Sequence, residues 1–124
     1  MTINKNTRFL IVGLGLLGGS YARGLTEKGY YVEAITKNQQ DCEFALEHEI
    51  VKKCTTQVDA EMIKSADVII FALYPDIFIK WIEENGKLIK PGTVITDVTG
   101  VKGTTNTNIF FLINKNKLNN IRRR

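Results

Sequence analysis

Three glycines close to the N-terminus have the spacing with which a protein backbone binds a diphosphate. Gly13, Gly15 and Gly18 form the pattern G-x-G-x-x-G, directly after an apolar run and directly before a helix-like stretch. In this pattern the first glycine permits a tight turn, the second lets the backbone approach a pyrophosphate, and the third lets the helix pack close to the strand. The first N–H groups of such a helix are unpaired and face the phosphates. The residues expected to bind a dinucleotide here are Gly13, Leu14, Gly15, Leu16, Leu17 and Gly18.

A second group of polar residues follows about 20 positions later. At this distance an Asp or Glu would accept a hydrogen bond from the ribose 2′-hydroxyl of NAD, and its charge would repel a 2′-phosphate. The chain instead has Thr36, Lys37 and Asn38, which offer a hydroxyl, a positive charge and an amide donor. This set suits a 2′-phosphate and predicts NADP rather than NAD as the cofactor. The alternative is that Lys37 is an ordinary exposed lysine and that the domain accepts both cofactors.

A third candidate segment, Leu73-Tyr74-Pro75, follows five apolar residues at 68–72 that read as a buried parallel strand. Ligands of open α/β sheets bind beyond the carboxyl ends of the strands. These three residues are therefore expected beside the cofactor. Pro75 also fits the first turn of the next helix, where its missing N–H is harmless, and both roles are compatible.

The remaining residues that could do chemistry do not form a site. His48 is the one histidine, and we expect it on a helix surface rather than as a catalytic base. Cys42 and Cys54 lie twelve positions apart without a C-x-x-C pattern, which predicts reduced thiols of no special role. One histidine and two scattered cysteines do not make a metal-ligand set. Five aromatic residues are expected to pack in the core or between helices: Tyr21, Tyr30, Tyr31, Phe44 and Trp81.

Strand-like and helix-like apolar patterns alternate along the chain and supply the elements that would position these residues. Strands are predicted at 7–12, 31–35, 53–55, 68–72 and 94–97, and helices at 16–28, 41–49, 60–65 and 76–85. Gly29 is expected at the C′ position of the first helix. This alternation predicts an α/β fold: a Rossmann-like, doubly wound, mainly parallel sheet with helices on both faces.

Bulk composition limits the remaining function classes. The chain has 124 residues, which is enough for one domain, with 44% hydrophobic and 24% charged residues. No apolar run is long enough to span a bilayer and no secretory leader is evident, so a cytoplasmic protein without membrane contact is expected. The net charge of +4 arises mainly beyond Lys102, where basic residues occur without acidic ones. We interpret this end as a solvated terminus rather than as a nucleic-acid site.

Four segments occur in an order shared with one enzyme family. They are the glycine-rich run at 13–20 and the segments at 45–50, 66–75 and 90–103. In this order and at these distances they resemble the N-terminal domain of the prephenate/arogenate dehydrogenases, NAD(P)-dependent enzymes of tyrosine biosynthesis. The similarity covers about residues 7–103. We expect residues 1–103 to form the NAD(P)-binding Rossmann domain, with 104–124 as a divergent or incomplete segment.

The resemblance implies roles for further residues, and it also shows where this chain departs from the family's pattern. In the family the turn at Leu73–Pro75 lies along the cofactor, and the loop after the fifth strand, here with Asp97 and Thr99, faces the nicotinamide. The family's serine in this loop is replaced by Gly100, and Thr99 is the neighbour that would take over part of its role. The family's later Gly-His-Pro-Met segment, with the catalytic histidine, has no counterpart here, nor does its helical substrate and dimerisation domain.

The sequence therefore predicts a truncated gene product or a fragment that binds the cofactor without appreciable turnover, and no catalytic residue is assigned. Whether prephenate or arogenate is the substrate of the full-length relative is left open. Two alternatives remain: the same domain of another dehydrogenase or reductase, such as a pyrroline-carboxylate reductase or a hydroxyacid dehydrogenase, and a non-catalytic nucleotide-binding module.

Overall fold

Five parallel strands form the sheet at the centre of the molecule. The computed structural model describes residues 3–98, so Thr99, Gly100 and the segment at 104–124 lie outside the described residues. The strand order is β3-β2-β1-β4-β5, and every described pair is parallel. The strands are β1 (Arg8–Val12), β2 (Tyr31–Ile35), β3 (Lys53–Thr55), β4 (Val68–Phe71) and β5 (Val94–Asp97). In this order the chain reverses direction across the sheet between β1 and β4, which is where open α/β sheets bind ligands.

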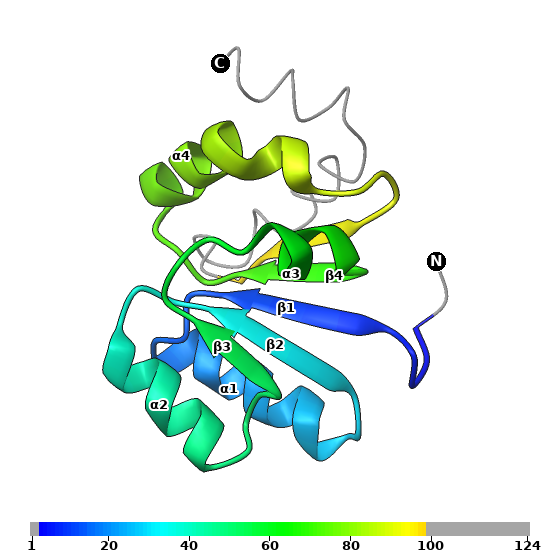
Figure 1. Cartoon of the computed structure of the whole chain (residues 1–124), viewed down its shortest axis with the longest axis vertical. Helices are drawn as coiled ribbons and strands as arrows, with labels where there is room; N and C mark the ends of the chain where they lie inside the picture. The colour runs from blue at the N-terminus through cyan, green and yellow to red at the C-terminus, as the bar shows by residue number, and fades with distance from the viewer. Residues whose placement is uncertain (1–2, 99–124) are drawn as a thin grey trace.

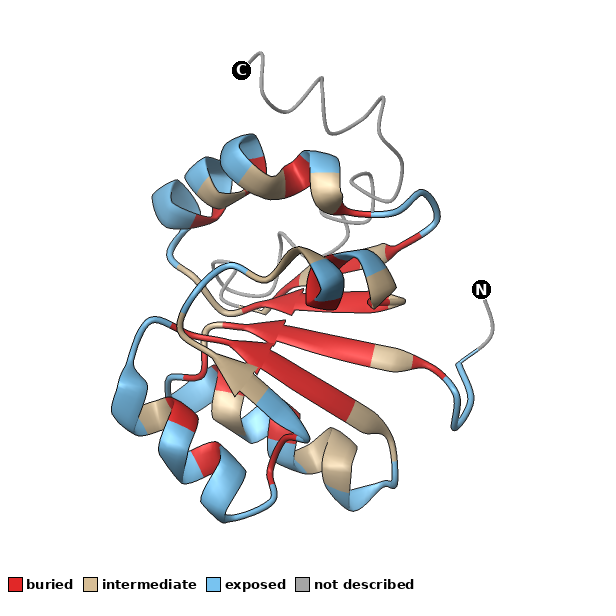
Figure 2. Ribbon diagram, in the orientation of Figure 1, coloured by how far each residue is buried: buried red, intermediate tan, exposed pale blue. Residues whose placement is uncertain are grey.

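Helices cover both faces of this sheet (Figure 1). On one face lie α1 (Leu16–Glu27) and α2 (Gln39–Glu47), and on the other lie α3 (Ala60–Ser65) and α4 (Pro75–Asn85). The central strands β1, β2 and β4 are almost wholly buried between the two helical layers, whereas the edge strand β3 is exposed or half-buried (Figure 2). The predicted doubly wound fold is confirmed. A short 3-10 helix, η1 (Gly86–Leu88), continues from α4 and was not predicted.

Local sequence signals explain where the helices begin and end. The side chains of Asn38 and Asp59 cap α2 and α3 by accepting the backbone N–H groups of Asp41 and Met62. Pro75 occupies the first position of α4, as predicted. Gly29 follows α1 with φ +90, which confirms its C′ position.

Two predictions about individual side chains are wrong. Cys42 and Cys54 are not separate thiols: they pair as a disulfide that joins α2 to β3, with their Cα atoms 5.6 Å apart. The pairing arises because the buried face of α2 packs along β3, which sequence spacing does not reveal. Tyr21 and Phe44 are exposed rather than packed in the core. The Phe44 ring stacks on the ring of His48, the residue that caps the end of α2, with ring centroids 4.0 Å apart.

Candidate functional site: the glycine loop and the neighbouring strand ends

The turn between β1 and α1 is shaped by glycines with distinct roles. Gly13 has φ +97, a conformation that L side chains rarely adopt, and its N–H donates to the Ile35 carbonyl at 2.8 Å. A Cβ atom on Gly18 would lie 1.8 Å from the Gly13 carbonyl oxygen, so only glycine lets α1 approach the turn this closely. Gly15 differs from both, because nothing lies within 4 Å of a Cβ atom placed there. The backbone at Gly15 is therefore open to a ligand.

The N-terminus of α1 is arranged to attract an anion. Gly15 is the N-cap residue, so no side chain caps this end, and the first turn contains no acidic residue. The amide groups of the first turn and the positive end of the helix dipole thus have no protein counter-charge from the helix itself. Leu16 is 97% exposed and Leu17 is also exposed, so neither side chain is drawn into the core. A diphosphate would receive hydrogen bonds here.

Three residues predicted to bind the ribose end lie at the carboxyl end of β2, but their side chains do different things. Thr36 is buried, and its Oγ1 accepts a hydrogen bond from the Leu14 N–H at 3.2 Å. The Oδ1 atom of Asn38 accepts from the Asp41 N–H at 3.0 Å, which leaves the Asn38 amide nitrogen outside this bond. Lys37 is exposed. Of the three, Lys37 and the Asn38 amide group are the donors placed toward solvent.

The predicted residues after β4 and β5 reach the same edge of the sheet. Leu73 lies beside the glycine turn, since its Cδ2 atom is 3.1 Å from the place of a Gly13 Cβ. Tyr74 is exposed at the N-cap of α4. Asp97 is buried at the end of β5, in register with Phe71 of β4. The structure therefore gathers the predicted residues of positions 13–18, 36–38, 73–75 and 97 at one edge, as the carboxyl ends of parallel strands require.

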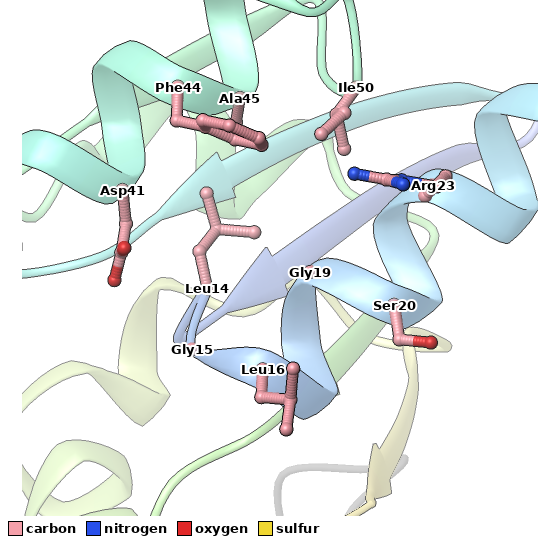
Figure 3. Close-up of a pocket in the computed structure, with 10 residues that line it drawn as sticks. All are labelled: Leu14, Gly15, Leu16, Gly19, Ser20, Arg23, Asp41, Phe44, Ala45 and Ile50. Atoms are coloured by element: carbon pink, nitrogen blue, oxygen red, sulfur yellow. The ribbon is translucent and has the colours of Figure 1, made fainter.

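A cavity of about 560 Å³ flanks the glycine loop between α1 and α2 (Figure 3). Its lining includes three predicted residues, Leu14, Gly15 and Leu16, together with residues outside the predicted set. The latter are Gly19, Ser20, Arg23, Asp41, Phe44, Ala45 and Ile50. No sequence signal could have identified these residues, because the cavity forms only where two helices pack side by side. It adjoins the uncapped helix end, but its lining includes none of the predicted residues at 36–38, 73–75 and 97.

Within positions 3–98, no three or more His, Cys, Asp and Glu side chains are grouped as they would be to hold a metal ion. In the same part of the chain, no helix has the length and apolar character needed to cross a membrane.

A doubly wound parallel sheet, a glycine turn and an uncapped helix together define a nucleotide-binding domain of the Rossmann class. Within this class the family is also clear. The family described as "Prephenate dehydrogenase, nucleotide-binding domain" matches residues 21–118, and the chain belongs to it. Among curated proteins, none matches the sequence significantly.

Solved structures agree with this assignment. An arogenate dehydrogenase from Synechocystis is 26% identical with a TM-score of 0.72, and the match covers 86% of this chain and 37% of that one. A prephenate dehydrogenase from Aquifex aeolicus, in complex with hydroxyphenyl propionate and NAD+, is 23% identical with a TM-score of 0.70, covering 94% and 38%. A 3-hydroxyisobutyrate dehydrogenase from Mycobacterium tuberculosis shares the fold, with 20% identity, a TM-score of 0.64 and coverage of 73% and 31%. The chain thus spans just over a third of the first two relatives.

Proposed function

We propose that this chain is the cofactor-binding part of an oxidoreductase that acts on prephenate or arogenate, and that its cofactor is NADP. The observation that carries the proposal is the uncapped N-terminus of α1 beneath an open Gly15, at the edge where the predicted residues gather. A diphosphate fits there because free amides, a helix dipole and an empty approach coincide. Bound nicotinamide would accept a hydride from the substrate, and the protein would supply position and electrostatics.

The preference for NADP rests on the end of β2. Thr36 stands where a carboxylate would repel a 2′-phosphate, and Lys37 is exposed beside it. Because a charge-assisted hydrogen bond to phosphate is stronger than a neutral one, Lys37 would favour NADP over NAD. The Aquifex aeolicus relative was solved with NAD+, so the preference proposed here concerns this chain and its own residues.

Calorimetric titration of the 124-residue chain with NADP+ and with NAD+ tests both parts of the proposal. We expect tighter binding of NADP+, and we expect Lys37→Ala to weaken NADP+ binding about tenfold while leaving NAD+ binding unchanged. Lys80→Ala is the matched control, because Lys80 is an exposed lysine on α4, on the other face of the sheet. No heat at millimolar dinucleotide would refute cofactor binding. Tighter NAD+ binding with a silent Lys37→Ala would refute the NADP preference alone.

The chain is expected to bind without turnover. A dehydrogenase of this kind needs a base for the substrate's proton, and histidine is the usual one. The one histidine, His48, is exposed at the end of α2, where its Nδ1 atom lies 3.0 Å from the Phe44 carbonyl oxygen. Mixing the chain with NADP+ and either prephenate or arogenate should therefore produce no absorbance of reduced nicotinamide. Measurable reduction would show that the described residues and the remainder of this chain suffice for catalysis.

A further inference from the structure

We infer that Thr36 is a positioning residue, which holds the glycine loop in the form that receives a diphosphate, rather than primarily a contact to the ribose. The inference rests on the proposed dinucleotide binding and adds a mechanism to it. It derives from one contact: the hydrogen bond from the Leu14 N–H to Thr36 Oγ1, 3.2 Å long and buried. Leu14 is the residue between the first two glycines of the loop.

Thr36 is held firmly enough to act as an anchor. Its own N–H donates to the Thr55 carbonyl of β3 at 3.1 Å, and only 7% of the residue is exposed. One position earlier, the Ile35 carbonyl accepts the Gly13 N–H at 2.8 Å. Two successive amides of the loop, those of Gly13 and Leu14, are therefore bonded to two successive residues at the end of β2. The acceptor of the first bond is the main-chain carbonyl of Ile35, and the acceptor of the second is the side-chain hydroxyl of Thr36.

The hydrogen bonds within the loop determine which of its amides can bind a ligand. The Leu14 N–H is turned toward the end of β2 and is not available to a ligand. The amides that follow belong to the uncapped first turn of α1 and remain for the diphosphate. Without the Thr36 hydroxyl, the Leu14 N–H would be a buried donor with no partner, which backbones avoid by shifting to find another acceptor. Such a shift would move the neighbouring amides that face the phosphates.

Two substitutions at Thr36 and one at Thr7 distinguish an effect on the position of the glycine loop from an effect on the stability of the fold. Thr36→Val removes the acceptor at nearly constant shape, and Thr36→Ser restores it. Thr7→Val is the matched control, since Thr7 is also buried and its Oγ1 also accepts a backbone N–H, that of Asn4, at 2.9 Å. Thr7 immediately precedes β1 and Leu14 follows it, so the control lies at the opposite end of this strand.

Calorimetry with NADP+, ADP and adenosine 2′-monophosphate gives the decisive comparison, because only the first two contain a diphosphate. Thr36→Val should weaken binding of both about tenfold and change binding of adenosine 2′-monophosphate less than twofold. Thr36→Ser and Thr7→Val should stay within about twofold of the wild type for all three. Amide hydrogen exchange at Leu14 should be slow in the wild type, in Thr36→Ser and in Thr7→Val, and fast in Thr36→Val.

The outcomes that overturn the inference are distinct from those that overturn the proposed function. If the wild type binds NADP+ and Thr36→Val binds it equally well, the positioning role is wrong while cofactor binding stands. Equal losses for ADP and adenosine 2′-monophosphate would show a ribose-end contact instead. An equal loss in Thr7→Val would show a general effect of stability. If the wild type binds no dinucleotide, the proposed function fails and the inference fails with it.

Discussion

A Cβ atom on Gly18 would lie 1.8 Å from the carbonyl oxygen of Gly13. This distance is far below van der Waals contact, and the obstacle is backbone rather than a flexible side chain. Gly18 also faces Ala72, whose Cβ would be 3.2 Å away. The third glycine of the loop is therefore required by the fold itself, whether or not a ligand is present.

Gly18→Ala should consequently destabilise the protein by about 3 kcal/mol or more, because α1 must move away from the end of β1. Urea denaturation followed by circular dichroism measures the loss. Gly24→Ala is the control within the same helix: nothing lies within 4 Å of its Cβ position, so alanine should stabilise α1 by up to about 1 kcal/mol. Similar stabilities for the two variants would contradict the close approach of helix and turn.

Gly15→Ala should have the opposite profile, with an intact fold and impaired binding. Gly15 has φ -56, which L residues adopt, and no atom lies within 4 Å of its Cβ position. The added methyl group would instead occupy the space that a diphosphate needs. We expect unfolding free energy within about 0.5 kcal/mol of the wild type and a loss of NADP+ affinity of at least about tenfold.

The same Gly24→Ala variant serves as the binding control, because Gly24 lies in α1 about two turns beyond the loop. It should bind NADP+ as the wild type does in calorimetry. Unimpaired binding by Gly15→Ala would mean that the phosphates do not approach this part of the backbone, and the site assignment would have to change.

The fold could be predicted from the sequence because its signals are local. Val68–Phe71 is a short apolar run rich in β-branched residues, and the structure buries it in the middle of the sheet. Gly29 ends α1 because few other residues adopt its positive φ. The glycine loop could be predicted for the same reason. Within six residues its pattern contains one glycine for a tight turn, one for the approach of a ligand to the backbone and one for the close packing of the helix. Every predicted strand and helix is present, with ends that differ by at most two residues.

The properties that sequence could not predict depend on contacts between distant segments. Cys42 and Cys54 meet because α2 packs along β3, and a spacing of twelve residues does not show this. The Thr36 hydroxyl points to Leu14, 22 positions earlier in the chain, whereas its residue type alone indicated a ribose contact. Phe44 resembled a core residue by type, yet it is half exposed, stacks on His48 and lines the cavity between α1 and α2.

The disulfide between Cys42 and Cys54 should add stability by restricting the unfolded chain. For a closed loop of this length, the expected contribution is about 3 kcal/mol. Reduction by dithiothreitol should lower the urea midpoint of the wild type, and Cys54→Ser should show the lower value with or without reductant. Equal midpoints for reduced and oxidised wild type, or two reactive thiols in the native protein without reductant, would contradict the bridge.

The stability of the fold at low pH should depend on Asp67. This residue lies at the amino-terminal ends of the strands, opposite the glycine loop. Its carboxylate accepts the Arg8 N–H and pairs with Lys90, each at 2.8 Å, and so joins the starts of β1 and β4 to the segment before β5. Burial alone would raise the pKa of Asp67, but the bonds from Lys90 and Arg8 outweigh it and lower the pKa below its ordinary value of 3.8. The folded state therefore binds this proton less readily than the unfolded chain does.

A lowered pKa of a carboxyl group stabilises the fold above the unfolded value, and this contribution is lost as the pH falls through the folded pKa. Asp67→Asn should lower the free energy of unfolding by about 1 kcal/mol at pH 7, because a charged acceptor is replaced by a neutral one. The difference from the wild type should begin to shrink near pH 3.8, where the unfolded chain takes up this proton, and should be lost as the pH falls through the lower pKa of the folded wild type. Urea denaturation between pH 7 and pH 2.5 measures the change, with the exposed Glu83→Gln on α4 as control. A difference that persists unchanged at the acid end would show that the carboxylate's charge does not stabilise this edge of the sheet.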